Sequence, residues 1–208
     1  MKTKRKNQIV VVGGLILILF FLIPGGGICV PPKISNPILR SGDLFPSISF
    51  SNLFTAEEKE YLGADEKAIL SLENIPAEVL VIKYLNTNCI FCIKSLPCFS
   101  KIFHTIEQDP NLSKKIKIIG IGAGDTPTEV AAFKKQHAVP YPIIPDTEFK
   151  AHKAVNEPTV PFIVITKRNE QGKWVVATVH VGLTFSAEAF VGELKAILVV
   201  DRKTLQKN

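Results

Sequence analysis

The amino-acid sequence predicts an α/β fold with a central mixed β-sheet flanked by helices. Three stretches support this prediction, because each is a short run of apolar and β-branched residues, at 79–85, 116–122 and 162–165. Such runs are typical of strands that are buried on both faces of a sheet. Segments with a helical pattern lie between the runs, and this alternation of strands and helices is typical of an α/β sheet.

Local signals place the remaining elements. A helix should begin after Thr55, because Thr55 and Glu58 form the capping-box pattern, and another after Thr126, which precedes a proline. The expected elements are, in order, strands at 68–72 and 79–85, a helix at 89–107, a strand at 116–122, a helix at 126–137, a strand at 141–146, a helix at 147–155, strands at 162–165 and 174–181, and a helix at 186–199.

The first 30 residues predict a targeting segment that is not part of the fold. A positively charged flank at residues 2–6 precedes an unbroken apolar run at 9–23. Positive charge before such a run keeps the N-terminus in the cytoplasm and directs the following domain across the membrane. We expect an uncleaved anchor in the inner (cytoplasmic) membrane, because the run with its flanks approaches the ~20 residues that span a bilayer. Cleavage after Gly27, which would release the domain into the periplasm, is the alternative.

The rest of the chain divides into three parts. Residues 31–41 contain several prolines and are interpreted as a linker. Residues 42–199 hold all the predicted strands and helices and form one domain. Residues 200–208 are a polar tail.

Charge and composition exclude several functions. The net charge is +6, but residues 2–6 carry four of these charges, so the body of the chain is nearly neutral. This distribution does not provide a nucleic-acid surface, and no nucleic-acid partner is expected. The glycine-rich loop at 122–125 is followed by neither a dinucleotide-binding pattern nor a phosphate-binding lysine, so we expect no cofactor.

Cys89 and Cys92 form a Cys-x-x-Cys motif between a predicted strand and a predicted helix. Cys89 therefore lies at a helix N-terminus, where unpaired N–H groups favour the thiolate, and Cys92 lies one turn further on. The alternatives are half of a zinc site and a structural disulfide. A zinc site needs two more ligands, and the chain has no second such motif and no closely spaced histidine pair. We interpret the pair as a redox dithiol and expect no metal.

The strand, the motif and the helix together resemble the active site of the thioredoxin-like superfamily. The chain from about residue 42 to residue 199 is similar to the TlpA/ResA-type (MauD-like) thiol–disulfide oxidoreductases of that superfamily. Pro97 matches the proline that kinks the active-site helix of thioredoxins, and the helix and strand at 126–146 match a unit that the TlpA-type branch inserts. The segment at 42–50 resembles the opening strand of these domains.

The resemblance implies a thioredoxin-like fold with an N-terminal extension, and a site around the dithiol. Cys89 would be the nucleophile and Cys92 the resolving thiol. Val160 and Pro161 precede an apolar run and resemble the cis-proline loop of the superfamily, whose backbone pairs with a substrate strand. With the intervening Ile90 and Phe91, Val160 and Pro161 would bind the substrate.

Asn88 and Lys83 depart from the family pattern, and the pair between the cysteines differs from that of strongly oxidising relatives. Asn88 replaces the tryptophan that usually precedes the first cysteine, and the pair between the cysteines is apolar where strongly oxidising relatives have a histidine. We therefore predict a reductant. Lys83 replaces a buried acid, and it would either lower the thiol pKa values as a cation or act as a base when neutral. A third possibility is that Lys83 extends to the surface.

These features predict a membrane-anchored, extracytoplasmic thiol–disulfide oxidoreductase. Its partners would be client proteins with disulfides, for example in cytochrome c or metalloenzyme maturation, and a membrane electron donor. A peroxiredoxin-like peroxidase and a Sco-like metal chaperone are the alternatives on the same fold. The peroxidase motif Pro-x-x-x-Thr-x-x-Cys is absent, and Sco proteins use Cys-x-x-x-Cys.

Other reactive side chains are expected to have structural or surface roles. Cys98 should face away from the dithiol and be buried, because nine residues turn a helix by about 180° from Cys89. Glu107, Asp125 and His104 are expected at the surface.

Overall fold

The structure is a computed structural model that describes residues 39–51, 54–63, 69–182 and 186–201. The predicted targeting segment at 1–30, most of the linker at 31–41 and most of the tail at 200–208 lie outside these ranges. Among the helices that the structure describes, none is both long and apolar enough to cross a membrane.

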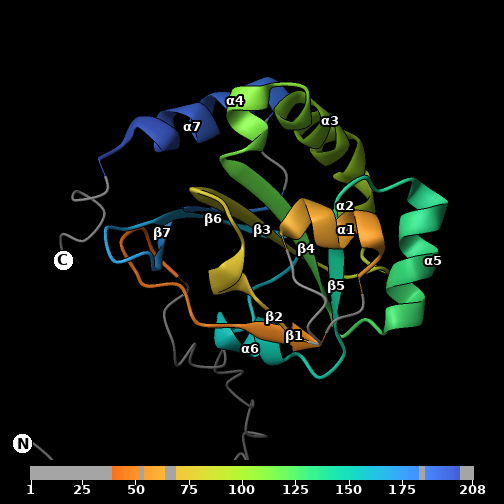
Figure 1. Cartoon of the computed structure of the whole chain (residues 1–208). Coiled ribbons are helices and arrows are strands. Elements are labelled where there is room, and N and C mark those ends of the chain that lie inside the picture. Colours follow the sequence, from red (N-terminus) through yellow and green to blue (C-terminus); the bar gives the residue numbers. More distant parts are fainter. Residues whose placement is uncertain (1–38, 52–53, 64–68, 183–185, 202–208) are drawn as a thin grey trace, which may run out of the picture. The chain divides into compact units, whose positions relative to one another are not determined.

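The elements follow the predicted alternation of strands and helices (Figure 1). In chain order they are β1 (Ser49–Ser51), α1 (Ala56–Leu62), β2 (Ile69–Ser71), a 3-10 turn (Leu72–Asn74), β3 (Val79–Leu85), α2 (Ile90–Lys94), α3 (Leu96–Glu107), α4 (Pro110–Ser113), β4 (Ile116–Ala123), α5 (Pro127–His137), β5 (Ile143–Asp146), α6 (Lys150–Ala154), β6 (Phe162–Arg168), β7 (Trp174–Val181) and α7 (Ala187–Val199).

The central sheet is mixed, as the sequence predicted. Its strand order is β5-β4-β3-β6-β7, with β3, β4 and β5 parallel and with β6 and β7 antiparallel to their neighbours. All seven residues of β3 are buried, because β3 is the middle strand and helices or loops cover both of its faces. The carboxyl end of β3 therefore has a fixed position, and only residues 86–88 separate it from Cys89.

The predicted opening strand differs from the observed one. Only Ser49–Ser51 form a strand, and it pairs with β2 in a separate two-stranded sheet. The preceding residues instead run along the edge of β7, where Leu44 makes an isolated bridge with Val175. This segment pairs with part of the sheet edge, which would otherwise expose unpaired backbone groups.

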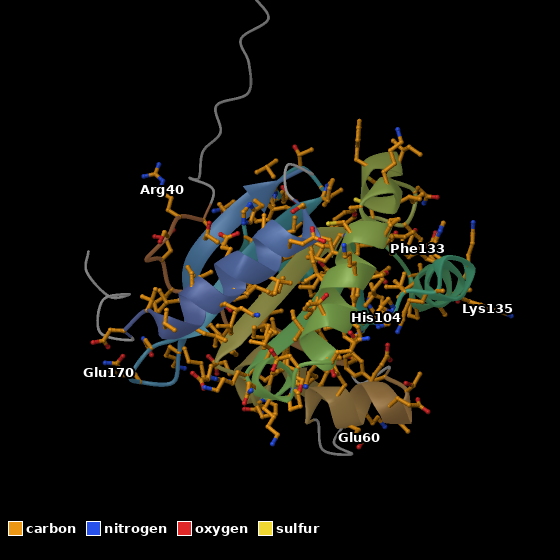
Figure 2. The ribbon with its side chains drawn as sticks, turned by 90° about the horizontal axis from the view of Figure 1, so that it is seen from above. Arg40, Glu60, His104, Phe133, Lys135 and Glu170 are labelled. Carbon is orange, nitrogen blue, oxygen red and sulfur yellow. The ribbon has the colours of Figure 1, made fainter. Side chains whose placement is uncertain are left out.

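Two apolar clusters pack on opposite faces of β3. One contains Val81 together with Phe99 of α3 and Phe190 of α7, and these two helices lie side by side (Figures 1 and 2). The other contains Ile82 and Tyr84 together with residues of β1, β2 and α6. The alternation of side chains along a strand explains why neighbouring residues of β3 belong to different clusters.

The predicted active-site helix is divided in two. Ser95 ends α2 and begins α3, and Pro97 lies in the first turn of α3. Proline is tolerated there because its missing N–H needs no helical partner at that position. The α3 helix ends at Glu107, where the predicted helix ended, and Asp109 caps the short α4.

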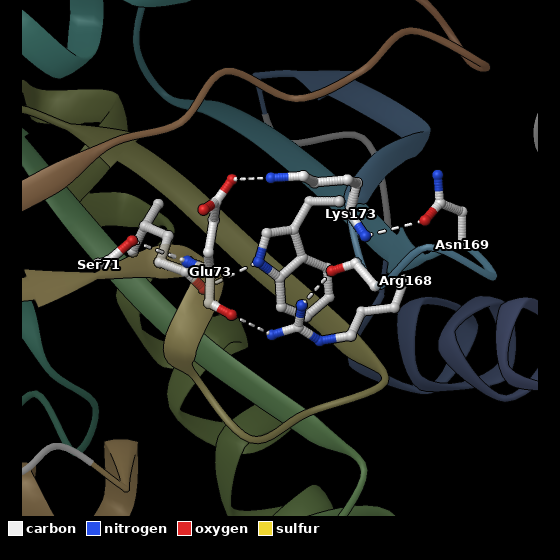
Figure 3. A network of polar contacts seen from close by, with 8 residues as sticks. Ser71, Glu73, Arg168, Asn169 and Lys173 are labelled. Carbon is white, nitrogen blue, oxygen red and sulfur yellow. Dashed lines mark hydrogen bonds and ion pairs between the residues drawn. The ribbon is translucent and has the colours of Figure 1, made fainter.

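A polar network holds the far end of the sheet (Figure 3). The Arg168 guanidinium donates to the carbonyl oxygens of Glu73, Ile75 and Ala77, which lie in the segment that leads from β2 to β3. The same guanidinium lies 4.0 Å from the centroid of the Trp174 ring, whose Nε1 donates to the Leu72 carbonyl. The network therefore joins the β6–β7 hairpin to the start of β3.

A buried lysine caps the C-terminal helix. The Lys167 ammonium donates to the carbonyl oxygens of Ile197, Leu198 and Val200 at 2.7, 2.8 and 2.5 Å. The last carbonyls of a helix have no partner within the helix, so a donor from β6 satisfies them and complements the helix dipole. This contact joins α7 to the sheet.

Replacing this lysine should loosen α7. Lys167→Met is expected to lower the free energy of unfolding by about 2–3 kcal/mol, because three helix carbonyls lose a charged donor. Urea denaturation would measure the loss. Lys195→Met on the exposed side of α7 is the matched control and should change stability by less than about 0.5 kcal/mol. Equal losses in the two variants would contradict the role of Lys167.

Candidate active site

The first cysteine lies where β3 turns into α2. Residues 86–88 form the turn, and the Cys89 N–H donates to the Asn86 carbonyl at 3.1 Å. Cys89 is the N-cap of α2, and its Sγ accepts the Cys92 N–H at 3.3 Å. Cys89 is also partly exposed. The structure thus brings together an accessible sulfur and a backbone donor from the next helical turn.

The second cysteine is internal. Cys92 is fully buried, and burial, reinforced by its hydrogen bond with Cys89, raises the pKa of the Cys92 thiol to about 12. The two cysteines therefore have different environments: solvent reaches Cys89, while Cys92 is held as a thiol behind it. Two-step disulfide exchange needs such an asymmetry, and the roles of nucleophile for Cys89 and resolving thiol for Cys92 stay predictions.

The loop before β6 reaches the first sulfur. The Val160–Pro161 peptide bond is cis, as predicted, and the Val160 carbonyl oxygen lies 3.8 Å from Cys89 Sγ. The loop is held from behind by His152 of α6, whose Nε2 lies 2.8 Å from the Pro158 carbonyl oxygen. Sequence reasoning did not identify His152, because its partner is a backbone group that no residue pattern marks.

Two apolar side chains between the cysteines face the solvent. Ile90 is 56% exposed and Phe91 is 62% exposed, although both are large and apolar. Val160 is partly buried next to Cys89. Exposed apolar groups beside a reactive sulfur form a surface that a partner can cover.

Of the alternatives that the sequence left open for Lys83, extension to the surface is excluded. Lys83 has no exposed area, and its Nζ donates to Ser95 Oγ at 2.6 Å and to the Tyr141 hydroxyl at 3.5 Å. Nζ also lies 4.2 Å from the centroid of the Phe99 ring. Burial lowers the pKa of Lys83 to about 8, and the nearby thiols, Cys92 foremost, act in the opposite direction. Ser95 and Tyr141 were not identified from the sequence, because they lie 12 and 58 residues from Lys83.

Asp125 is buried, which corrects the prediction that it lies at the surface. Its carboxylate accepts hydrogen bonds from Asn86 Nδ2 at 3.0 Å and from the Thr87 N–H and hydroxyl at 3.0 and 2.8 Å. Burial raises the pKa of Asp125, and the hydrogen bonds from Thr87 oppose this shift. Asp125 therefore holds the turn that precedes Cys89. Its place after β4 was the available signal, since the carboxyl ends of parallel strands meet at one edge of a sheet.

The remaining predictions give mixed results. His104 is exposed on α3 (Figure 2), whereas Glu107 is partly buried and burial raises its pKa. Cys98 is only partly buried, and burial raises its pKa. It also lies near enough to Lys83 to influence that group, because the break at Ser95 invalidates the assumption of one continuous helix. Within the described ranges, no three His, Cys, Asp or Glu side chains gather where they could hold a metal ion.

Solved structures share the fold of this chain. The chain matches a protein from Chlorobium tepidum assigned as thiol:disulfide interchange protein DsbE, with 16% identity, a TM-score of 0.58 and coverage of 77% of this chain and 99% of the other. A secreted disulfide oxidoreductase of Mycobacterium tuberculosis matches with 15% identity, a TM-score of 0.50 and coverage of 62% and 89%. This chain has the thioredoxin-like fold.

The same fold also occurs in Mycobacterium tuberculosis AhpC, which matches with 16% identity, a TM-score of 0.58 and coverage of 78% and 95%. No protein-family model matches the sequence, and no curated protein matches it. At these identities the similarity establishes the fold, and proteins that share a fold can carry out different reactions.

The two sulfurs should react very differently with an alkylating reagent. At pH 7, iodoacetamide is expected to modify Cys89 and leave Cys92 intact, because the reagent can reach Cys89, whereas Cys92 is buried and its raised pKa keeps it protonated until the pH approaches about 12. Mass spectrometry of peptides from the reduced protein would measure both. Equal labelling of the two cysteines at pH 7 would contradict the assignment of Cys89 as the accessible thiol and Cys92 as the buried one.

Loss of the Asp125 carboxylate should release the turn. In Asp125→Ala, the Thr87 amide is expected to exchange with solvent at least about tenfold faster, because a hydrogen bond to a charged group is worth roughly 1.5–3 kcal/mol. Hydrogen exchange with peptide-level mass spectrometry would measure this. Asp109→Ala, which removes the analogous bond to the Asn111 N–H, is the control and should leave the exchange of the 86–89 turn unchanged.

Proposed function

We propose that this protein is a thiol–disulfide oxidoreductase that reduces disulfides of client proteins through Cys89 and Cys92. The observation that carries the proposal is the asymmetry of the pair: Cys89 Sγ is accessible and accepts the Cys92 N–H, whereas the Cys92 side chain is fully buried, which raises its pKa. An accessible nucleophile with a second thiol one turn behind it is what two-step disulfide exchange needs.

The reaction proceeds in two exchanges. The Cys89 thiolate attacks one sulfur of a client disulfide, and the other client sulfur leaves with the electron pair and takes up a proton. Cys92 then attacks Cys89 Sγ, which forms the Cys89–Cys92 disulfide and releases the second client thiol. The client gains two electrons and the protein loses two. A membrane electron donor then reduces the new disulfide and closes the cycle.

A client would bind on the surface around Cys89. Ile90 and Phe91 offer exposed apolar contacts, and the loop at Val160 and Pro161 lies against the sulfur. The Val160 N–H has no hydrogen bond to any described residue, so an extended client segment could pair with this backbone. Client proteins in cytochrome c or metalloenzyme maturation meet this description, because their cysteines must be reduced before they bind haem or metal.

The cellular location is part of the same proposal. The apolar run at 9–23 behind a positive flank supports an anchor in the cytoplasmic membrane, with the domain on the extracytoplasmic side. A periplasmic or secreted form would follow if the segment is cleaved. A domain on that side would obtain its electrons through the membrane, which is why a membrane donor is included.

The first test is the reduction potential of the pair. On the full-length protein in mild detergent, equilibration with dithiothreitol buffers followed by thiol alkylation is expected to give a value near the roughly −270 mV of thioredoxin. The apolar Ile90 and Phe91 supply no positive charge that would stabilise the reduced form further. Cys89→Ser is the control and should abolish the two-electron transition.

Other outcomes would change the proposal in defined ways. A potential near −120 mV would make the protein an oxidant. Absence of a Cys89–Cys92 disulfide under all buffers would exclude the exchange reaction altogether. Consumption of peroxide, or tight copper binding without redox activity, would favour the peroxidase or the metal chaperone instead.

A further inference from the structure

An unusual charge lies directly behind the dithiol. Lys83 occupies the middle of β3 and points to the face of the sheet that α2 and α3 cover, since Ser95 between those helices accepts its hydrogen bond. Its side chain has no exposed area. Burying an ammonium group is costly unless an anion compensates it, so the partners of Lys83 decide what it can do.

Lys83 has no carboxylate partner within the described part of the chain. None of the ion pairs found there includes it. The titratable groups that face it are three thiols and one phenol, contributed by Cys89 and Cys92 at α2, by Cys98 on α3 and by Tyr141 before β5. All four groups are uncharged when protonated, and burial raises the pKa of Tyr141 far above neutrality. The anion that can appear here is a thiolate.

The hydrogen bonds fit a neutral amine. The Ser95 hydroxyl donates its hydrogen to the Cys92 carbonyl oxygen, so towards Lys83 it acts as an acceptor, at 2.6 Å. The Tyr141 hydroxyl is the second acceptor, at 3.5 Å. A neutral amine has two N–H groups, which these acceptors use, and one lone pair, which remains. An ammonium group has a third N–H, which the Phe99 ring at 4.2 Å can receive.

We propose that Lys83 is the general base that removes the proton from Cys92 when Cys92 attacks the mixed disulfide at Cys89. The inference rests on the proposed disulfide exchange. Cys92 is buried behind Cys89, so the lone pair of an internal amine is a suitable proton acceptor where bulk water does not reach. The Ser95 bridge fixes this amine relative to the backbone of Cys92.

The step balances as follows. The Cys92 S–H bond breaks, and its proton binds the Lys83 amine to give an ammonium group beside a thiolate. The thiolate attacks Cys89 Sγ, the Cys89–Cys92 bond forms, and the bond between Cys89 and the client sulfur breaks. That sulfur leaves with the electron pair as a thiolate and takes up a proton. With the Cys92 thiolate consumed, Lys83 loses the anion that favoured its charge and returns its proton to solvent.

The test isolates the second exchange. Full-length protein in mild detergent, with Cys29 and Cys98 replaced by serine, is reduced and mixed with 5,5′-dithiobis(2-nitrobenzoate). A first release of nitrothiobenzoate reports formation of the mixed disulfide at Cys89, and a second release reports attack by Cys92. At pH 7.5, Lys83→Met should slow the second release by about 100-fold, the usual contribution of a general base, and leave the first within about twofold.

The pH profile separates a base from a structural role. In the parent protein, the second release should rise with pH and level off near pH 8, where the Lys83 amine becomes neutral. In Lys83→Met it should keep rising towards pH 12, because Cys92 must ionise unaided. Lys167→Met, which removes another buried lysine, is the matched control and should retain the parent profile.

A second variant serves if Lys83→Met does not fold. Ser95→Ala removes the acceptor at 2.6 Å, which weakens the ammonium form of Lys83 and should move the levelling point to lower pH. Two outcomes would overturn the role of Lys83 while leaving the exchange reaction in place. One is that Lys83→Met changes neither the rate of the second release nor its pH profile. The other is that the rate in Ser95→Ala levels off at the same pH as in the parent protein. Absence of any second release in the parent protein would instead overturn the exchange reaction.

Discussion

The burial of β3 on both faces is the constraint on which the rest of the structure depends. Six of its seven residues pack into two apolar clusters, so the register of the strand cannot shift by one residue without moving these side chains out of their clusters. The turn that carries Cys89 starts where this strand ends. The Cys89 sulfur, on a short turn, is therefore held at the end of a strand that is buried along its whole length.

The buried strand β3 contains one lysine, Lys83. Lys83 interrupts an apolar run at the point where a packed core would favour another aliphatic side chain. The structure tolerates it because Ser95, Tyr141 and the Phe99 ring receive its N–H groups. Two of these partners come from the break between α2 and α3 and from the segment before β5, so the polar pocket depends on the whole α/β arrangement.

Other polar contacts hold the loops at the ends of the strands. Asp125 after β4 holds the turn after β3, and His152 of α6 holds the loop before β6. The far end is fastened by Arg168, which crosses to the start of β3 (Figure 3). Polar groups thus secure both ends of the strands, while apolar packing secures their middle. This division is expected for a sheet whose ends carry loops and whose centre excludes water.

Most of the elements and the reactive pair could be predicted from the sequence, whereas the break between α2 and α3 could not. Apolar runs, capping patterns and the Cys89–Cys92 spacing each involve residues that are close in the sequence, so they can be recognised without the tertiary structure. The tertiary structure alone decided the surroundings of the pair. Lys83 and Asp125 are buried among hydrogen-bond partners that lie 12 to 58 residues away in the chain. Phe91 is exposed because no other element in the described part of the chain packs over it. Protonation depends on such distant neighbours and on desolvation, which a local pattern does not record.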